Sequence, residues 1–171
     1  NLEERLGYVH KGIEKRFESL AWEQGHRLAG RISGDTTVAH ALGFCTALEA
    51  MTACAVPERA HWIRALLLER ERIANHCGDL GAIANDAAFA FLWYQMARIK
   101  EQVLRTNRVL FGHRFMMDCI VPGGVAVDLA PDSHAAIESM LSALAEDFER
   151  IMYVYDEAPS LQDRTVTTGT V

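Results

Sequence analysis

Two short polar clusters contain the residues whose types and spacing could do chemistry. The first holds His10, Gly12 and Glu14. A histidine and a glutamate four positions apart meet on one face of a helix, close enough to pass a proton through one water. Gly12 removes a side chain between them, so another backbone or a ligand could approach closely. The plainer interpretation is a surface ion pair in the first turn of a helix.

The second cluster is the segment RISGDTTVAH, residues 31–40. Small and hydroxyl residues crowd the entrance to an apolar helix, and Thr36 and His40 lie one turn apart. Either this segment binds a ligand, or it is an ordinary helix N-terminus, capped by Asp35 or Thr36, whose histidine is satisfied in the core. The residues alone leave both interpretations open.

Recognised metal and nucleotide motifs are missing from the sequence. Glu58 and His61 have the i, i+3 spacing of di-iron carboxylate bundles, but that motif occurs once where such sites need two copies and further carboxylates. The seven histidines form no H-x-x-x-H pair. Neither the dinucleotide-binding motif G-x-G-x-x-G nor the phosphate-binding motif G-x-x-x-x-G-K-[ST] is present. We therefore expect no metal site in this chain and interpret Glu58 and His61 as a solvated pair.

The elements that must position these clusters are mostly helices. Apolar residues recur at three- and four-residue steps, as they do along one face of a helix, and prolines and glycines mark the ends of the helices. Pro122-Gly123-Gly124 between β-branched residues predicts a short extended segment with a tight turn. The fold class is therefore mainly α, a multi-helix bundle of about five helices, several of them long and antiparallel. The expected helices cover about 9–22, 36–55, a stretch opened by Pro57 whose apolar stripe reaches Cys77, 87–111 with Gly112 as C-cap, and 132–157 ended by Pro159.

Composition limits the classes of function. The chain has 171 residues, one domain by the usual length prior, and a net charge of -6, which makes nucleic acid an unfavourable partner. No uncharged apolar run reaches the roughly 20 residues of a membrane-spanning helix. The four cysteines are far apart, as expected for buried free thiols in a reducing compartment. Asn1 and the polar, β-prone end RTVTTGTV suggest that residues 1–171 form a single helical domain cut from a longer subunit.

Five blocks in order make the sequence resemble the large subunit of membrane-associated group 4 [NiFe] hydrogenases and the related 49 kDa subunit of respiratory complex I. The resemblance covers nearly the whole chain and implies a hydrogenase large subunit-like helical fold. The blocks are GYVHKGIEK (7–15), RISGDTTVAH (31–40), ALEAM (47–51), VPERAHWIRALLLERERIANH (56–76) and GHRFMMDCIVPGGVAVDL (112–129).

The departures from this family concern the metal. Nickel–iron enzymes carry R-x-C-G-x-C-x-x-x-H, and here that pattern aligns with Arg31, Ser33, Gly34, Thr36 and His40. Both cysteine positions hold hydroxyls, which are hard and poorly acidic ligands where a nickel site needs soft thiolates. The resemblance therefore implies a chain that lacks the nickel–iron centre.

The resemblance to complex I implies roles for the remaining polar residues. His10 matches a histidine of the quinone-contacting N-terminal loop, whereas Gly34 replaces the tyrosine that contacts quinone. Arg31 matches the arginine beside the terminal Fe–S cluster of the neighbouring small subunit, and the histidine on that side aligns with Met116 or Met117. Glu14 matches the proton-conduit glutamate of hydrogenases. The candidate catalytic residues are thus Glu14 and His10, and the candidate cofactor-binding residues are Arg31 and His40.

By this resemblance the chain is part of a complex I-like or hydrogenase-like oxidoreductase that moves electrons from NADH, or another reduced donor, to quinone. It would bind no cofactor alone; a small Fe–S subunit would supply the cluster, and NAD would act only in the whole complex. The complex would lie peripherally on the cytoplasmic, inner face of the cell membrane, joined to membrane-arm subunits. The alternative is a catalytically silent scaffold for the small subunit. The isolated fragment is expected to be inactive and could self-associate.

Overall fold

The computed structural model describes residues 2–166, and this part of the chain is almost entirely helical. The expected mainly α fold is confirmed. The elements in order are α1 (Ile13–Glu18), a short 3-10 helix (Trp22–Gln24), α2 (Gly25–Ala29), α3 (Thr37–Thr52), α4 (Glu58–Asp86), α5 (Ala90–Phe111), β1 (Ile120–Val121), β2 (Gly124–Val125), α6 (Ser133–Asp156) and α7 (Pro159–Thr165).

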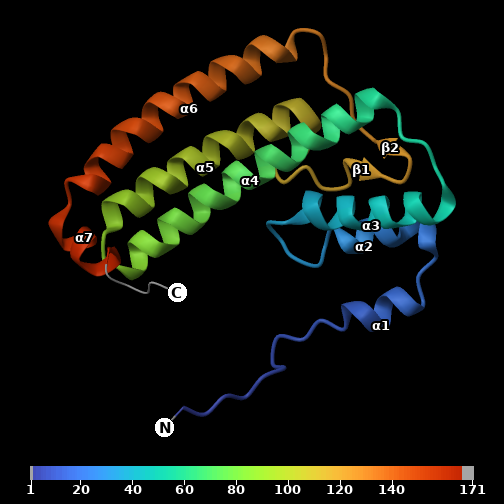
Figure 1. Cartoon of the computed structure of the whole chain (residues 1–171), viewed down its shortest axis with the longest axis horizontal. Helices are drawn as coiled ribbons and strands as arrows, with labels where there is room; N and C mark the ends of the chain where they lie inside the picture. Colours follow the sequence, from blue (N-terminus) through green and yellow to red (C-terminus); the bar gives the residue numbers. More distant parts are fainter. Residues whose placement is uncertain (1, 167–171) are drawn as a thin grey trace.

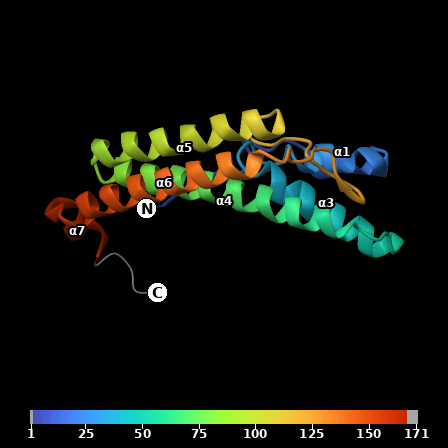
Figure 2. The same cartoon turned by 90° about the horizontal axis from the view of Figure 1, so that it is seen from above.

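Three long helices, α4, α5 and α6, lie side by side and form one half of the molecule (Figures 1 and 2). Helix α4 has 29 residues, a length of about 44 Å at the usual rise. Its neighbour α5 buries Leu92, Met96 and Ile99 against it, with Cys77 on the α4 side. These apolar side chains recur on one face of each helix, which is why the two helices pack side by side.

The other half contains α2, α3 and the hairpin β1–β2, which gather around the N-terminal turns of α4 (Figure 1). Val121 pairs with Gly124 across the turn, and Gly123 has a φ of 79°. Proline followed by a glycine of positive φ is the combination of a type II turn, so the expected tight turn is confirmed. Val38, Cys45, Leu67 and Ile120 form the core of this half.

A buried ion pair joins α3, α4 and the hairpin. The Arg64 guanidinium donates two hydrogen bonds to the Glu49 carboxylate, at 2.6 and 2.9 Å, and two more to the carbonyls of Val121 and Gly124. Glu49 also accepts a bond of 2.7 Å from the Gly123 amide. Both side chains are less than a tenth exposed. Since every bond is charge-assisted and the two side chains are largely shielded from water, this pair fixes the hairpin on the two helices.

The first expected helix was too long. Gly12 has a φ of 64° and stands just before α1, so residues 9–12 lie outside the helix, and α1 ends at Glu18. The stripe of Ile13, Phe17 and Leu20 therefore spans only one short helix and the turn that follows it. A left-handed glycine at the N-terminus of α1 stops the helical path that periodicity alone predicted.

The C-terminal boundary was also misjudged, because Pro159 opens α7 as well as following α6. Proline is favoured in a first helical turn, where its missing N–H has no partner to lose. With α2 and α7, residues 2–166 contain seven α-helices where about five were expected. The expected boundaries of α3, α5 and α6 are confirmed to within a few residues, including Gly112 as the C-cap of α5. Part of the β-prone stretch, residues 167–171, lies outside the described residues.

The cysteines are free, and three of the four are buried. Cys45, Cys77 and Cys119 lie in the core, whereas Cys54 is exposed and departs from the expectation. Burial raises the pKa of Cys45 and Cys119 to about 11. These two thiols therefore remain protonated and unreactive at neutral pH.

Replacing Arg64 by methionine is expected to lower the free energy of unfolding by about 3–5 kcal/mol, because it leaves the Glu49 carboxylate buried without its partner. Urea denaturation followed by circular dichroism measures the change. Arg72→Met, in the same helix, removes an exposed pair with Glu69 and should cost under about 1 kcal/mol. Equal losses in the two variants would show that the buried pair has no special role.

Large apolar side chains remain exposed along the long helices, among them Ile83, Val109 and Tyr153, and α6 buries only Ile137 and Ile151. Exposed apolar side chains that lie together favour contacts between molecules. The purified chain should therefore self-associate or bind an apolar dye such as ANS, measured by light scattering and fluorescence. A strictly monomeric, dye-silent protein would contradict this expectation.

Candidate functional site

The segment between α2 and α3, residues 30–36, is the centre of the candidate site. Helix α2 ends at Gly30, where an added Cβ would lie 2.8 Å from the Thr37 hydroxyl, so only glycine lets α3 begin this close. The amides of Arg31 and Ile32 donate to the carbonyls of Leu28 and Ala29, at 2.9 and 3.1 Å. The chain therefore turns tightly and places the Arg31 side chain at the surface.

Arg31 is fixed by a two-pronged ion pair with Asp118. The two guanidinium nitrogens donate to the two carboxylate oxygens at 2.7 and 2.8 Å, and Nη1 also donates to the Arg27 carbonyl at 2.6 Å. Both side chains remain about two-fifths exposed. The hydrogen bonds lower the pKa of Asp118 and raise the pKa of Arg31, so both groups stay charged. The result is a positive group held in one orientation at the surface.

Asp118 reaches Arg31 from a strained loop that follows α5. Met116 and Asp118 have φ values of 53° and 62°, in a region that costs non-glycine residues about 1–3 kcal/mol. Met116 is buried in the core, whereas Met117 is half-buried. Of these two methionines, which the resemblance offers as counterparts of the cluster-side histidine, Met117 is therefore the more accessible. No local sequence pattern indicates the Arg31–Asp118 pair, whose members are 87 positions apart.

Helix α3 is capped by a side chain from another helix. The Glu71 carboxylate of α4 accepts bonds from the amides of Val38 and Ala39, at 2.6 and 2.8 Å. The expected caps, Asp35 and Thr36, make no side-chain cap bond, and Asp35 instead accepts a bond from Ser33. Because Glu71 is buried, desolvation raises its pKa, while the amide bonds oppose that shift. The N-terminus of α3 thus meets a negative charge, which stabilises it.

His40 lies at the end of the first turn of α3 with its side chain exposed. The interpretation in which the His40 side chain is buried in the core, with its hydrogen bonds satisfied there, is therefore wrong. Gly34 is also exposed and has nothing within 4 Å of an added Cβ. There is therefore open space at Gly34, three positions after Arg31.

His10 and Glu14 do not share a helix face. His10 lies before Gly12 in a turn, where its amide donates to the Gly7 carbonyl at 3.2 Å, whereas Glu14 is in the first turn of α1. Both side chains are exposed. The predicted helical pairing of these residues is wrong, because the left-handed Gly12 turns the chain between them. No side-chain bond within residues 2–166 joins His10, Glu14 and His40 to one another, so their roles stay predictions.

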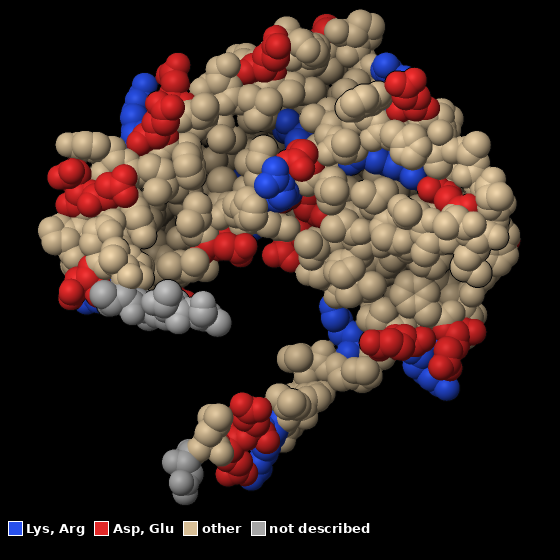
Figure 3. Space-filling view, viewed as in Figure 1, with Lys and Arg blue, Asp and Glu red and all other residues tan. Residues whose placement is uncertain are grey.

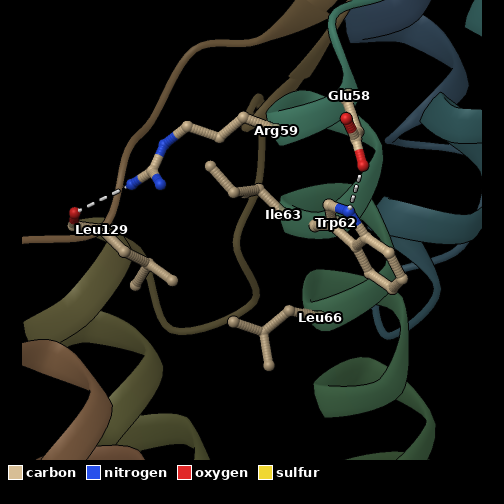
Figure 4. Close-up of a pocket in the computed structure, with 6 residues that line it drawn as sticks. All are labelled: Glu58, Arg59, Trp62, Ile63, Leu66 and Leu129. Carbon is tan, nitrogen blue, oxygen red and sulfur yellow. Dashed lines mark hydrogen bonds between the residues drawn. The ribbon is translucent and has the colours of Figure 1, made fainter.

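Glu58 and His61 are both exposed, as the solvated interpretation requires. Glu58 accepts a long bond of 3.5 Å from the Trp62 indole beside a cavity of about 410 Å³. Figure 4 shows this cavity, where the Arg59 side chain crosses to the Leu129 carbonyl and the apolar side chains form the walls. None of the predicted site residues lines it. Within residues 2–166, no group of three or more His, Cys, Asp or Glu side chains could hold a metal ion.

The relatives of this chain define its class, which includes the complex I 49 kDa subunit and hydrogenase large subunits. The sequence matches the family described as respiratory-chain NADH dehydrogenase, 49 Kd subunit, over residues 79–171, just over half of the chain. The chain belongs to this 49 kDa subunit family.

Individual relatives come from both branches of the class. The chain is 32% identical to an NADH-quinone oxidoreductase subunit of Roseiflexus castenholzii, over 97% of this chain and 40% of that protein. It is 30% identical to formate hydrogenlyase subunit 5 of Escherichia coli, over 96% of this chain and 29% of that protein. The chain thus spans less than half the length of these relatives.

A solved structure shares the fold. A chain of the archaeal membrane-bound sulfane sulfur reductase superposes with a TM-score of 0.89 at 24% identity, over 95% of this chain and 44% of that one. No helix in the described part of this chain is long and apolar enough to cross a membrane.

Proposed function

We propose that this chain is the N-terminal helical part of a longer subunit in a complex I-like oxidoreductase. In that complex, electrons from NADH or another reduced donor pass through the Fe–S clusters of a small partner subunit to a quinone-like acceptor. The complex lies on the inner face of the cell membrane, joined to membrane-arm subunits. NAD acts elsewhere in it, and this chain holds no nickel–iron centre.

The observation that carries this proposal is the fixed Arg31 guanidinium. Asp118 and the Arg27 carbonyl hold it in one orientation, and two-fifths of its side chain stays open to a neighbour. A guanidinium cannot lose its proton in a protein, so it supplies a permanent positive charge. Placed beside a partner's Fe–S cluster, that charge favours the reduced cluster and raises its potential.

The donor atoms in the same segment support a quinone-like acceptor over nickel. By the resemblance, Ser33 and Thr36 align with the two cysteines of the hydrogenase pattern, and the Ser33 hydroxyl donates to Asp35 at 2.9 Å. Neutral hydroxyls do not fit a centre that needs soft thiolates. In this proposal His10 and Glu14 exchange protons with the acceptor site, and His40 lies near the bound cofactor. Gly34 leaves that acceptor without the tyrosine hydrogen bond of complex I.

A catalytically silent scaffold is the second candidate. It is favoured by the exposure and separation of His10, Glu14 and His40, because acid–base groups that act together are usually within hydrogen-bond reach. As a scaffold the chain would only hold the small subunit and connect it to a membrane arm.

Replacing Arg31 by glutamine in the assembled complex should lower the midpoint potential of the nearest Fe–S cluster by an amount on the order of tens of millivolts, because it removes one nearby positive charge. Redox titration followed by electron paramagnetic resonance measures this. Arg59→Gln is the matched control, since Arg59 also pairs with an aspartate, Asp128, at 2.7 Å. An unchanged potential in Arg31→Gln would refute the role given to Arg31.

Replacing Glu14 by glutamine should reduce quinone-reductase turnover of the complex by at least about tenfold, the low side of what a positioned acid–base group contributes. Assembly should be unchanged, because the side chain is exposed and keeps its shape. Glu18→Gln, in the same helix, removes a carboxylate that pairs with Lys15 and should leave turnover intact. A silent Glu14→Gln would favour the scaffold, and failure to assemble would make Glu14 structural.

A further inference from the structure

A basic cavity lies between α1 and α2, where the N-terminal segment joins the body of the molecule. Its volume is about 490 Å³, and it is open to solvent. In Figure 3, Lys and Arg atoms face the hollow at this junction. No acidic residue lines the cavity. Its lining residues are Lys11, Ile13, Arg16, Leu20, Gln24, Arg27, Leu28 and Arg31.

The four positively charged side chains of this cavity differ in the partners that balance their charges. Arg31 is paired with Asp118, and the Lys11 ammonium donates a single bond to the Ile32 carbonyl. The side chains of Arg16 and Arg27 make no hydrogen bond or ion pair with any of residues 2–166, although Asp118 lies near enough to Arg27 for their charges to interact. In a chain of net charge -6, three positive groups without a carboxylate ion pair converge on one cavity. Such a cavity attracts an anion.

The shape and chemistry of the cavity favour a carboxylate carried on an apolar body. Guanidinium groups bind carboxylates through two parallel hydrogen bonds, and Arg16 and Arg27 both have this capacity unused. Ile13, Leu20 and Leu28 supply an apolar wall beside them. An aspartate or glutamate side chain with apolar neighbours would satisfy both parts of the lining at once.

The N-terminal segment next to the cavity indicates that this carboxylate belongs to a polypeptide. Residues 2–12 contain no helix or strand and extend away from the body (Figure 1). Leu2, Leu6, Tyr8 and Val9 are each more than four-fifths exposed. Helix α1 buries none of its residues. A free carboxylate or phosphate would fill the cavity and leave this apolar segment in water, whereas a protein surface would cover both.

We propose that the cavity between α1 and α2 receives an acidic side chain from another subunit, whose apolar surface covers residues 2–12. This inference rests on the proposed function, because it requires that the chain works as one subunit of a complex. The partner is defined by chemistry: an aspartate or glutamate flanked by apolar residues on a subunit other than this chain.

Zero-length cross-linking of the purified complex tests the proposal. A carbodiimide activates a carboxyl group and joins it, with loss of the urea, to an amine that touches it. The Lys11 amine should be joined to an Asp or Glu of another subunit, identified by mass spectrometry of the digested complex. Lys15 is the control within α1, since it is exposed, lies outside the cavity and pairs with Glu18.

Two double variants test how much the arginines of the cavity contribute to the contact. Arg16→Gln combined with Arg27→Gln should reduce both the Lys11 cross-link and the complex recovered in raised salt by about tenfold or more, as for charge pairs shielded at interfaces. The control is Arg105→Gln combined with Arg108→Gln, two exposed arginines of α5 outside the cavity, which gives an equal charge change and should have no effect.

The outcomes separate the two proposals. A Lys11 cross-link to another subunit that weakens in the double variant supports the acidic contact. A complex that purifies intact while Lys11 stays unlinked, or links only to its own chain or to a second copy of it, overturns this contact and leaves the proposed function standing. A chain that purifies without any other subunit contradicts both proposals.

Discussion

The Arg64–Glu49 ion pair is the interaction on which the rest of this structure depends. Its hydrogen bonds reach α3, α4 and both strands of the hairpin, so the elements around the candidate site share one buried connection. Glu49 has a pKa below its usual value because Arg64 donates to it. Its contribution is therefore complete above the pKa of an unfolded glutamate and is lost as the pH falls through the lower folded value.

A second carboxylate, Glu71, connects this core to the site. It caps α3 from α4, and Asn75, one turn further on, donates to the Asp35 carbonyl at 3.1 Å. The 30–36 segment is therefore positioned by α4 more than by its own side chains. That placement in turn sets Arg31 where the strained loop after α5 presents Asp118. The fixed position of the Arg31 guanidinium therefore depends on packing contacts made by α4 and by the loop after α5.

The N-terminal segment contrasts with this rigid centre. His10 and Glu14 have exposed side chains and lie on a stretch whose bonds are mostly local, apart from the Lys11 contact to Ile32 and the stacking of Phe17 on Phe44. Segments that bury little apolar surface of their own can be ordered by a partner surface. If another subunit covers residues 2–12, the same contact would determine where His10 and Glu14 stand relative to Arg31. The contact that docks the other subunit would then also position the residues that are proposed to transfer protons.

The sequence by itself determined the helical class, the long helices, the Pro-Gly turn and the family, because periodicity, capping residues and ordered blocks are local signals. It also determined the chemistry of Ser33 and Thr36, since residue type decides what a ligand position can bind. Only the tertiary structure decided which side chains within the chain interact with one another. Asp118 for Arg31, Glu71 for α3 and Glu49 for Arg64 lie 87, 32 and 15 positions away, where no local pattern reaches. The left-handed Gly12 separated His10 from Glu14, because periodicity assumes a helical backbone that a positive φ interrupts.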